Sequence, residues 1–122
     1  MPQAVVAVRV HIYMHKYIYS VKLGLLGFEW DLNKERLNFR KHRVTFLDAM
    51  ERFFDESGFQ IDDSAHSRFE LRSYWVGKIA SGKVLTTRFT RRGNRFRIIG
   101  CAECRKFKKI YEASKAEKNE NQ

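Results

Sequence analysis

The sequence predicts a single α+β domain, in which two helices precede and one helix follows a twisted antiparallel sheet of three to four strands. Two helix-start signals lie close together after Trp30, period-two alternation begins at Phe69 and is broken by glycine turns, and helical spacing returns after Glu103. A chain of 122 residues is long enough for one hydrophobic core and short for two.

The first helix is expected to begin at Leu32, because the Asp31 carboxylate can accept hydrogen bonds from the free N–H groups of the next turn. Leu37 should face inward. The opposite stripe is polar and cationic, and consists of Lys34, Asn38, Lys41 and His42. Thr45 followed by Asp48 resembles a capping box and starts a second helix. The apolar face of that helix is Phe46, Ala49, Met50 and Phe53.

Three strands joined by short turns are expected to form an antiparallel meander over 69–76, 83–90 and 95–101, with a short fourth strand over 59–61. Glycines at 77, 82 and 93 mark the reversals. In the first of these strands, alternation places Phe69, Leu71 and Trp75 on one face. The other face carries Glu70, Arg72 and Tyr74.

Both ends of the chain differ from this central region. Residues 1–27 are expected to be an appendage, either poorly ordered or an edge element, in which Val6, Val8 and Val10 suit an extra strand. Phe107, Ile110, Tyr111 and Ser114 form one face of the C-terminal helix, and residues 115–122 are expected to fray or be disordered. The domain itself should span 28–114.

Charge favours a polyanionic or acidic partner, since 24 Lys and Arg against 14 Asp and Glu give a net charge of +10. Two cysteines cannot staple a secreted scaffold, and the N-terminus lacks the pattern of a signal peptide, so a cytoplasmic protein is expected. Charges interrupt every apolar run before it reaches membrane-spanning length. We therefore expect no membrane segment.

The densest positive charge lies between Arg88 and Lys109, where Glu103 is the single acidic residue. Such a stretch can bind phosphates, and the neighbouring rings of Tyr74, Phe89 and Tyr111 could stack on unpaired bases. The alternative is a basic, solvated face that keeps the domain soluble. The candidate RNA-binding residues are Lys34, Arg88, Arg91, Arg92, Arg95, Arg105 and Tyr111.

An ordered set of motifs resembles the BrnT-type toxins. The motifs are Phe28-Glu29-Trp30-Asp31, Arg72 with Gly77, Phe89-Thr90-Arg91-Arg92-Gly93, Arg97-Ile98-Ile99 and Tyr111. The resemblance implies a ribonuclease toxin of a type II toxin–antitoxin pair, with helices packed on a sheet as in the RelE toxins. It also implies neutralisation by a ribbon-helix-helix antitoxin, in a heterotetramer that binds promoter DNA through the antitoxin.

RNA cleavage requires a 2′-OH to lose its proton, charge stabilisation at phosphorus and a proton for the leaving oxygen. Toxins of the RelE-like kind rely on arranged cations, so no metal or other cofactor is expected. Arg72 and Arg97 are the candidates for transition-state charge, because strands hold both guanidinium groups rigidly. Glu70 is a candidate base or ion-pair partner, and Lys34, Lys41 or His42 are candidate acids or orienting groups.

Some positions depart from the family. Gly100-Cys101-Ala102 follows Arg97-Ile98-Ile99 where Ser-Ala-Arg is usual, so a second arginine is absent; Lys108 replaces a glutamate and Arg43 a glycine. A non-catalytic nucleic-acid-binding module and a purely antitoxin-binding protein are therefore alternatives. Cys101 and Cys104 have the spacing of half a zinc site, which His11 and His15 could complete, or they are two thiols at a strand end.

Overall fold

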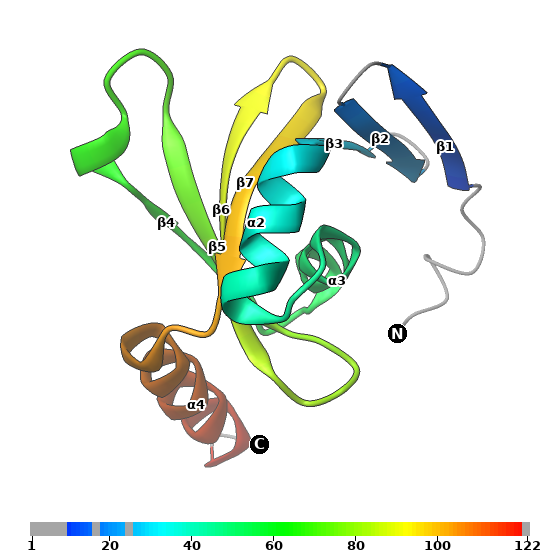
Figure 1. Cartoon of the computed structure of the whole chain (residues 1–122). Helices are drawn as coiled ribbons and strands as arrows, with labels where there is room; N and C mark the ends of the chain where they lie inside the picture. The colour runs from blue at the N-terminus through cyan, green and yellow to red at the C-terminus, as the bar shows by residue number, and fades with distance from the viewer. Residues whose placement is uncertain (1–9, 16–17, 24–25, 121–122) are drawn as a thin grey trace.

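The structure is a computed structural model that describes residues 10–15, 18–23 and 26–120 (Figure 1). Its strands form one sheet in the order β1-β2-β3-β7-β6-β5-β4, and five of the seven, β3 to β7, come from the chain after residue 25. The strands are β1 (Val10–His15), β2 (Ile18–Leu23), β3 (Leu26–Asp31), β4 (Phe59–Asp62), β5 (Arg72–Lys78), β6 (Val84–Arg92) and β7 (Arg95–Ala102). The helices are α2 (Leu32–His42), α3 (Phe46–Glu51) and α4 (Arg105–Glu120), with short 3-10 turns η1 (Arg52–Phe54) and η2 (Ser64–His66).

The α+β class and the antiparallel meander are confirmed. Strand β5 pairs antiparallel with β6, β6 pairs antiparallel with β7, and β4 extends the meander beside β5. The turn between β6 and β7 contains Gly93 at φ +60°, a left-handed conformation that glycine adopts without a steric penalty. Gly82 and Gly93 thus mark reversals as predicted, whereas Gly77, predicted as a third, lies inside β5 opposite Leu85.

The predicted strand count and the purely antiparallel pairing were wrong. Strand β3 lies parallel to β7, with Glu29 opposite Arg97 and Trp30 opposite Ile98. The sequence predicts the Trp30-Asp31 region only as a helix start, whereas Phe28 and Trp30 are buried side chains of a strand that ends where α2 begins. Strands β3 and β7 are far apart in the chain, and no local sequence pattern indicates that two such segments pair in parallel.

Both helix starts are confirmed by their capping bonds. The Asp31 carboxylate accepts from Asn33 N at 2.8 Å and Lys34 N at 3.1 Å, and Thr45 Oγ1 accepts from Asp48 N at 3.1 Å. Helix α2 ends at Arg43, which has the left-handed φ of 57°. Glycine is the usual residue at such a helix end, so Arg43 carries backbone strain there.

Two predicted inward-facing groups are exposed instead. Leu37 is 58% exposed, because α2 buries none of its residues and lies along the edge of β7 rather than over the sheet. Phe69 and Leu71 precede the strand, which begins only at Arg72, and they are 94% and 57% exposed. For Leu37 the predicted helix is present and tertiary placement decided burial, whereas for Phe69 and Leu71 the predicted strand start was wrong.

The edge of β7 next to α2 is closed by an amide side chain. Strand β3 pairs with β7 only as far as Ile98. Beyond that point, Asn38 Nδ2 donates to Cys101 O at 2.8 Å and Asn38 Oδ1 accepts from Cys101 N at 3.1 Å. Helix α2 is therefore fixed against β7 by two hydrogen bonds that a neighbouring strand would otherwise supply.

The two faces of the sheet are covered unequally. On the core face, α3 and η1 pack over a cluster that includes Phe28, Trp30, Phe46 and Leu85. On the opposite face, α4 covers one end only, where Val76, Val84 and Tyr111 form a second, smaller cluster with Phe59 and Phe107. We call this second face the arginine face, because its uncovered end carries Arg72 and Arg97.

The chain ends add to this framework. Strands β1 and β2 continue the sheet beyond β3, antiparallel to it and to each other, while Val6 and Val8 lie outside the described residues. The segment after Lys115, which we expected to fray, is helical as far as Glu120. The division at residues 27 and 114 stays a prediction.

Among the described helices, none has the length and apolar character needed to cross a membrane.

Candidate active site

Four residues form one row across the uncovered end of the arginine face. Strand register places Glu29 on β3 opposite Arg97 on β7, Arg97 opposite Thr90 on β6, and Thr90 opposite Arg72 on β5. Directly paired residues project to the same face of a sheet. Arg72 and Arg97 are therefore on the same face, separated by the width of one strand.

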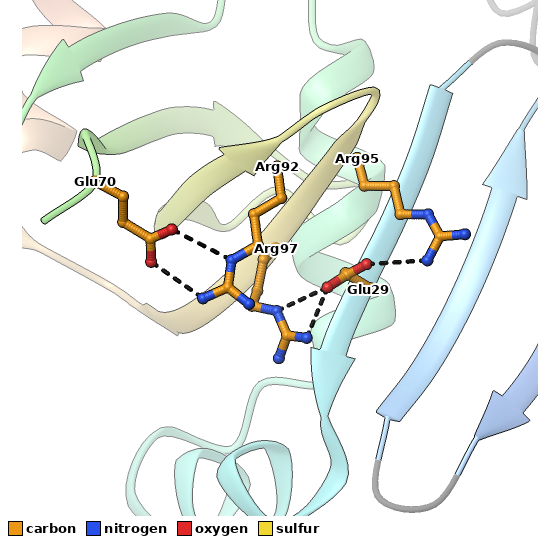
Figure 2. A network of polar contacts seen from close by, with 5 residues as sticks. All are labelled: Glu29, Glu70, Arg92, Arg95 and Arg97. Atoms are coloured by element: carbon orange, nitrogen blue, oxygen red, sulfur yellow. Dashed lines mark hydrogen bonds and ion pairs between the residues drawn. The ribbon is translucent and has the colours of Figure 1, made fainter.

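Arg97 is held in place by a buried carboxylate (Figure 2). Arg97 Nε and Nη2 lie 2.8 and 2.7 Å from Glu29 Oε2, and Arg95 Nη1 lies 3.2 Å from Glu29 Oε1. Glu29 is only 6% exposed, whereas the Arg97 side chain is 21% exposed. One buried acid thus orients two arginines while leaving part of the Arg97 guanidinium open to solvent.

A second acid lies on the other side of Arg97. Arg92 Nε and Nη2 donate to the two oxygens of Glu70 at 3.2 and 3.1 Å, a bidentate pair shown in Figure 2. The hydrogen bond from Arg92 holds the pKa of Glu70 below its usual value, and the charges of Arg72 and Arg97 act in the same direction. Glu70 is therefore an ionised ion-pair partner. Among the described residues, none forms a hydrogen bond with the Arg72 guanidinium.

The next row toward α4 opens into a pocket of about 310 Å³. In it, Arg88 on β6 lies between Tyr74 on β5 and Gly100 on β7. Arg88 Nε is buried and has no hydrogen-bond partner in the described part of the chain. The pocket is lined by Asn38, His42, Tyr74, Thr86, Arg88, Gly100, Cys101, Ala102, Cys104 and Phe107.

Tyr74 is the polar wall of this pocket opposite α2. Burial raises the pKa of its hydroxyl, and its hydrogen bond to Asp63 does so as well, while Arg88 acts in the opposite direction. The hydroxyl is therefore protonated, and its single proton is directed to Asp63. His42, the last residue of α2, completes the wall from the other side.

The structure brings together seven of the predicted site residues. Arg72 and Arg97 lie in the row, Glu70, Arg92 and Arg95 lie beside it and are joined by ion pairs to Glu29 or to each other, and Arg88 and His42 line the adjoining pocket.

The other five predicted residues lie elsewhere. Lys34 and Lys41 are exposed on α2 and Arg105 is exposed at the start of α4, and none of the three lines the pocket. Arg91 is on the core face, 5.6 Å above the Phe96 ring. Tyr111 is 1% exposed and its hydroxyl donates to Asp55 at 2.6 Å, so its ring is closed to a base.

Glu29 is the residue that sequence reasoning missed. It was noted only as part of a helix-start motif, yet it is the buried acid that positions Arg97. A signal existed, since a lone acid between Phe28 and Trp30 in an alternating strand must project to the face opposite the two aromatics.

The two cysteines are free thiols in the structure. Cys101 is buried, and burial raises the pKa of its thiol although the nearby Arg52 opposes this. Cys104 is half-buried and lines the pocket. Within the described residues, no group of three or more His, Cys, Asp or Glu is arranged to hold a metal ion. The side chains of His11 and His15 lie outside this description.

Comparison with known families agrees with the motifs. Residues 30–107, more than half of the chain, match the family model described as ribonuclease toxin, BrnT, of type II toxin-antitoxin system. The matched segment contains α2, the meander and the arginine face, and it ends just inside α4. Comparison with curated proteins found no match. The protein therefore belongs to the BrnT family of ribonuclease toxins of type II toxin–antitoxin systems.

Proposed function

We propose that this protein is an endoribonuclease that cleaves RNA without a metal ion at the uncovered end of the arginine face. The observation that carries the proposal is the placement of Arg72 and Arg97 on either side of Thr90. Arg88 lies two residues before Thr90 on β6, and the backbone positions of the two are roughly 7 Å apart at strand spacing. A phosphodiester lying across these rows meets three guanidinium groups.

Each group has a distinct role in the proposed reaction. Arg72 and Arg97 stabilise the charge that develops on the non-bridging oxygens as the 2′-OH attacks phosphorus. The proton that the 2′-OH loses passes to solvent water. His42, at the pocket wall, is the candidate to protonate the leaving 5′-oxygen. Lys41, beside it on α2, stays a candidate orienting group.

Glu70 fits the role of ion-pair partner better than that of general base. A general base works best when its pKa is close to the operating pH, and Arg92 moves the pKa of Glu70 in the opposite direction. Glu70 instead fixes Arg92, so that the cations at this end of the sheet keep their spacing.

The family usually has an arginine where this chain has Ala102, and its loss favours a non-catalytic nucleic-acid-binding module. The pocket, however, supplies another cation. Ala102 and Gly100 line the pocket without adding charge, and Arg88 lies on the same side. A Cβ on Gly100 would lie 4.0 Å from Arg88 Nη2. We propose that Arg88 provides charge stabilisation here.

A type II toxin has an antitoxin partner. We propose that the partner is a ribbon-helix-helix protein that covers the arginine face, and that the resulting heterotetramer binds promoter DNA through the antitoxin. The complex would act in the cytoplasm, with RNA as the toxin's substrate.

The test is cleavage of RNA by purified protein in the presence of a chelator. Arg72→Ala should lower the cleavage rate about a hundredfold or more. Arg91→Ala removes the same charge from the core face and should leave the rate within a few-fold. Binding without cleavage by the unaltered protein would support the non-catalytic module, and equal losses in the two variants would reject the proposed site.

A further inference from the structure

The most exposed large apolar side chain among the described residues lies just before the row of Glu29, Arg97, Thr90 and Arg72, which we call the arginine row. Phe69 is 94% exposed, in the segment between η2 and β5. Its immediate neighbours in the chain are Arg68 and Glu70, and the Arg68 guanidinium lies 5.7 Å from the centre of the Phe69 ring. An exposed aromatic ring beside a guanidinium group presents a flat apolar face on which a second ring can stack.

The chain on both sides of Phe69 is held by specific contacts. Before it, Ser67 Oγ accepts from Arg72 N at 2.9 Å and donates to Asp63 O. After it, Glu70 pairs with Arg92, and Leu71 O accepts from Thr90 Oγ1 at 2.8 Å. The ring is therefore presented outward from an anchored turn.

We propose that Phe69 is a stacking platform for one unpaired base of the RNA whose phosphate lies on the arginine row. The inference rests on the proposed function and adds the class of substrate, single-stranded RNA. Phe69 is three residues from Arg72, a span of at most about 10 Å. The stacked base and the bound phosphate thus belong to the same or neighbouring nucleotides.

Charge and geometry favour a nucleic acid over a protein as the occupant. A base offers a flat apolar ring and its phosphate a negative charge, which match Phe69 and the cations of Arg68 and Arg72. Bases inside a duplex are already stacked, so only an unpaired base can occupy the platform. Of the other aromatic rings on or near this face, Phe89 and Tyr111 are buried and closed to a base, and Tyr74 is half-buried in the pocket beside Arg88.

The test is equilibrium binding of a fluorescent 2′-O-methyl oligoribonucleotide, which lacks the nucleophile needed for cleavage, as a single strand and as a duplex. Phe69→Ala should weaken single-strand binding about 5- to 150-fold and leave duplex binding unchanged. Phe69→Trp should restore it. Leu71→Ala, at the neighbouring exposed apolar residue, is the matched control and should bind as the unaltered protein does.

Three results would overturn the inference. One is unchanged single-strand binding in Phe69→Ala, a second is an equal loss for single strand and duplex, and a third is unchanged RNA binding with weakened binding of the antitoxin, which would make Phe69 part of a protein interface. Failure of catalysis is distinguishable, because the unaltered protein would then leave ordinary RNA intact in chelator while its binding still depended on Phe69.

Discussion

The two ends of the arginine face are built from the same three strands but differ in every other respect. Along β6, the side chains on this face change from Val84 and Thr86, under α4, to Arg88, Thr90 and Arg92 at the open end. The covered end is held by apolar packing, and the open end by ion pairs with Glu29 and Glu70.

This difference separates stability from function within one surface. Apolar packing at the α4 end contributes free energy of folding without needing any exposed group. Ion pairs at the open end contribute less to stability, because the arginines are partly solvated, but they fix the direction of guanidinium groups. Substitutions at the open end should therefore affect cleavage more than folding, and substitutions at the covered end the reverse.

The largest effect is expected from Arg97→Ala. Cleavage should fall by about 10²- to 10³-fold, because one transition-state cation is lost. The same substitution should also lower the free energy of unfolding, since it leaves the buried Glu29 with Arg95 alone. Adding Glu29→Gln should recover part of the stability and none of the activity. Stability would be measured by denaturant unfolding and activity by the cleavage rate. Equal recovery of stability and activity would contradict the view that the ion pairs at the open end serve cleavage more than folding.

At the covered end, Tyr111→Phe removes one hydroxyl from a buried ring. The lost hydrogen bond to the Asp55 carboxylate should lower the free energy of unfolding by about 1.5–3 kcal/mol. Cleavage measured well below the unfolding temperature should stay within a few-fold. A loss of activity in folded protein would show that α4 takes part in catalysis.

Acid should act through the same contact. Burial raises the pKa of Asp55, but hydrogen bonds from Tyr111, Lys78 N and Ser57 N outweigh this and leave its pKa below the ordinary value. A carboxylate with a lowered folded-state pKa stabilises the fold above its unfolded pKa of about 4, and the contribution is lost as pH falls further. Asp55→Asn should flatten the dependence of unfolding free energy on pH below about 4. If the dependence were unchanged in this variant, carboxylates other than Asp55 would be responsible for the loss of stability in acid.

The smallest effect is expected from Glu70→Gln. Its pair with Arg92 is largely exposed, so unfolding free energy should change by less than about 1 kcal/mol. Cleavage should fall only a few-fold if Glu70 orients Arg92. A loss of about 10²- to 10⁴-fold, with a shifted pH–rate profile, would instead identify it as the general base.

Local signals predicted the elements that depend on neighbouring residues. Asp31 and Thr45 start helices, and Gly93 turns the meander, because each satisfies a requirement within a few residues. The parallel pairing of β3 with β7 depends on contacts between distant segments, which no periodicity encodes. Helical periodicity did place Tyr111 on one face of the C-terminal helix with Phe107, but it could not predict the hydrogen bond to Asp55, 56 residues away in the chain. For the site, residue type identified the arginines, but only register could show that Arg72 and Arg97 share a face while Arg91 does not.

The amide of Asn38 has a consequence for how the molecule behaves among copies of itself. By occupying both the donor and the acceptor of Cys101, it terminates strand pairing at the unprotected stretch of β7. Exposed strand edges are templates on which other chains can assemble. One side chain of α2, the helix that also carries His42 to the pocket, thus occupies backbone groups with which a strand of another chain could pair.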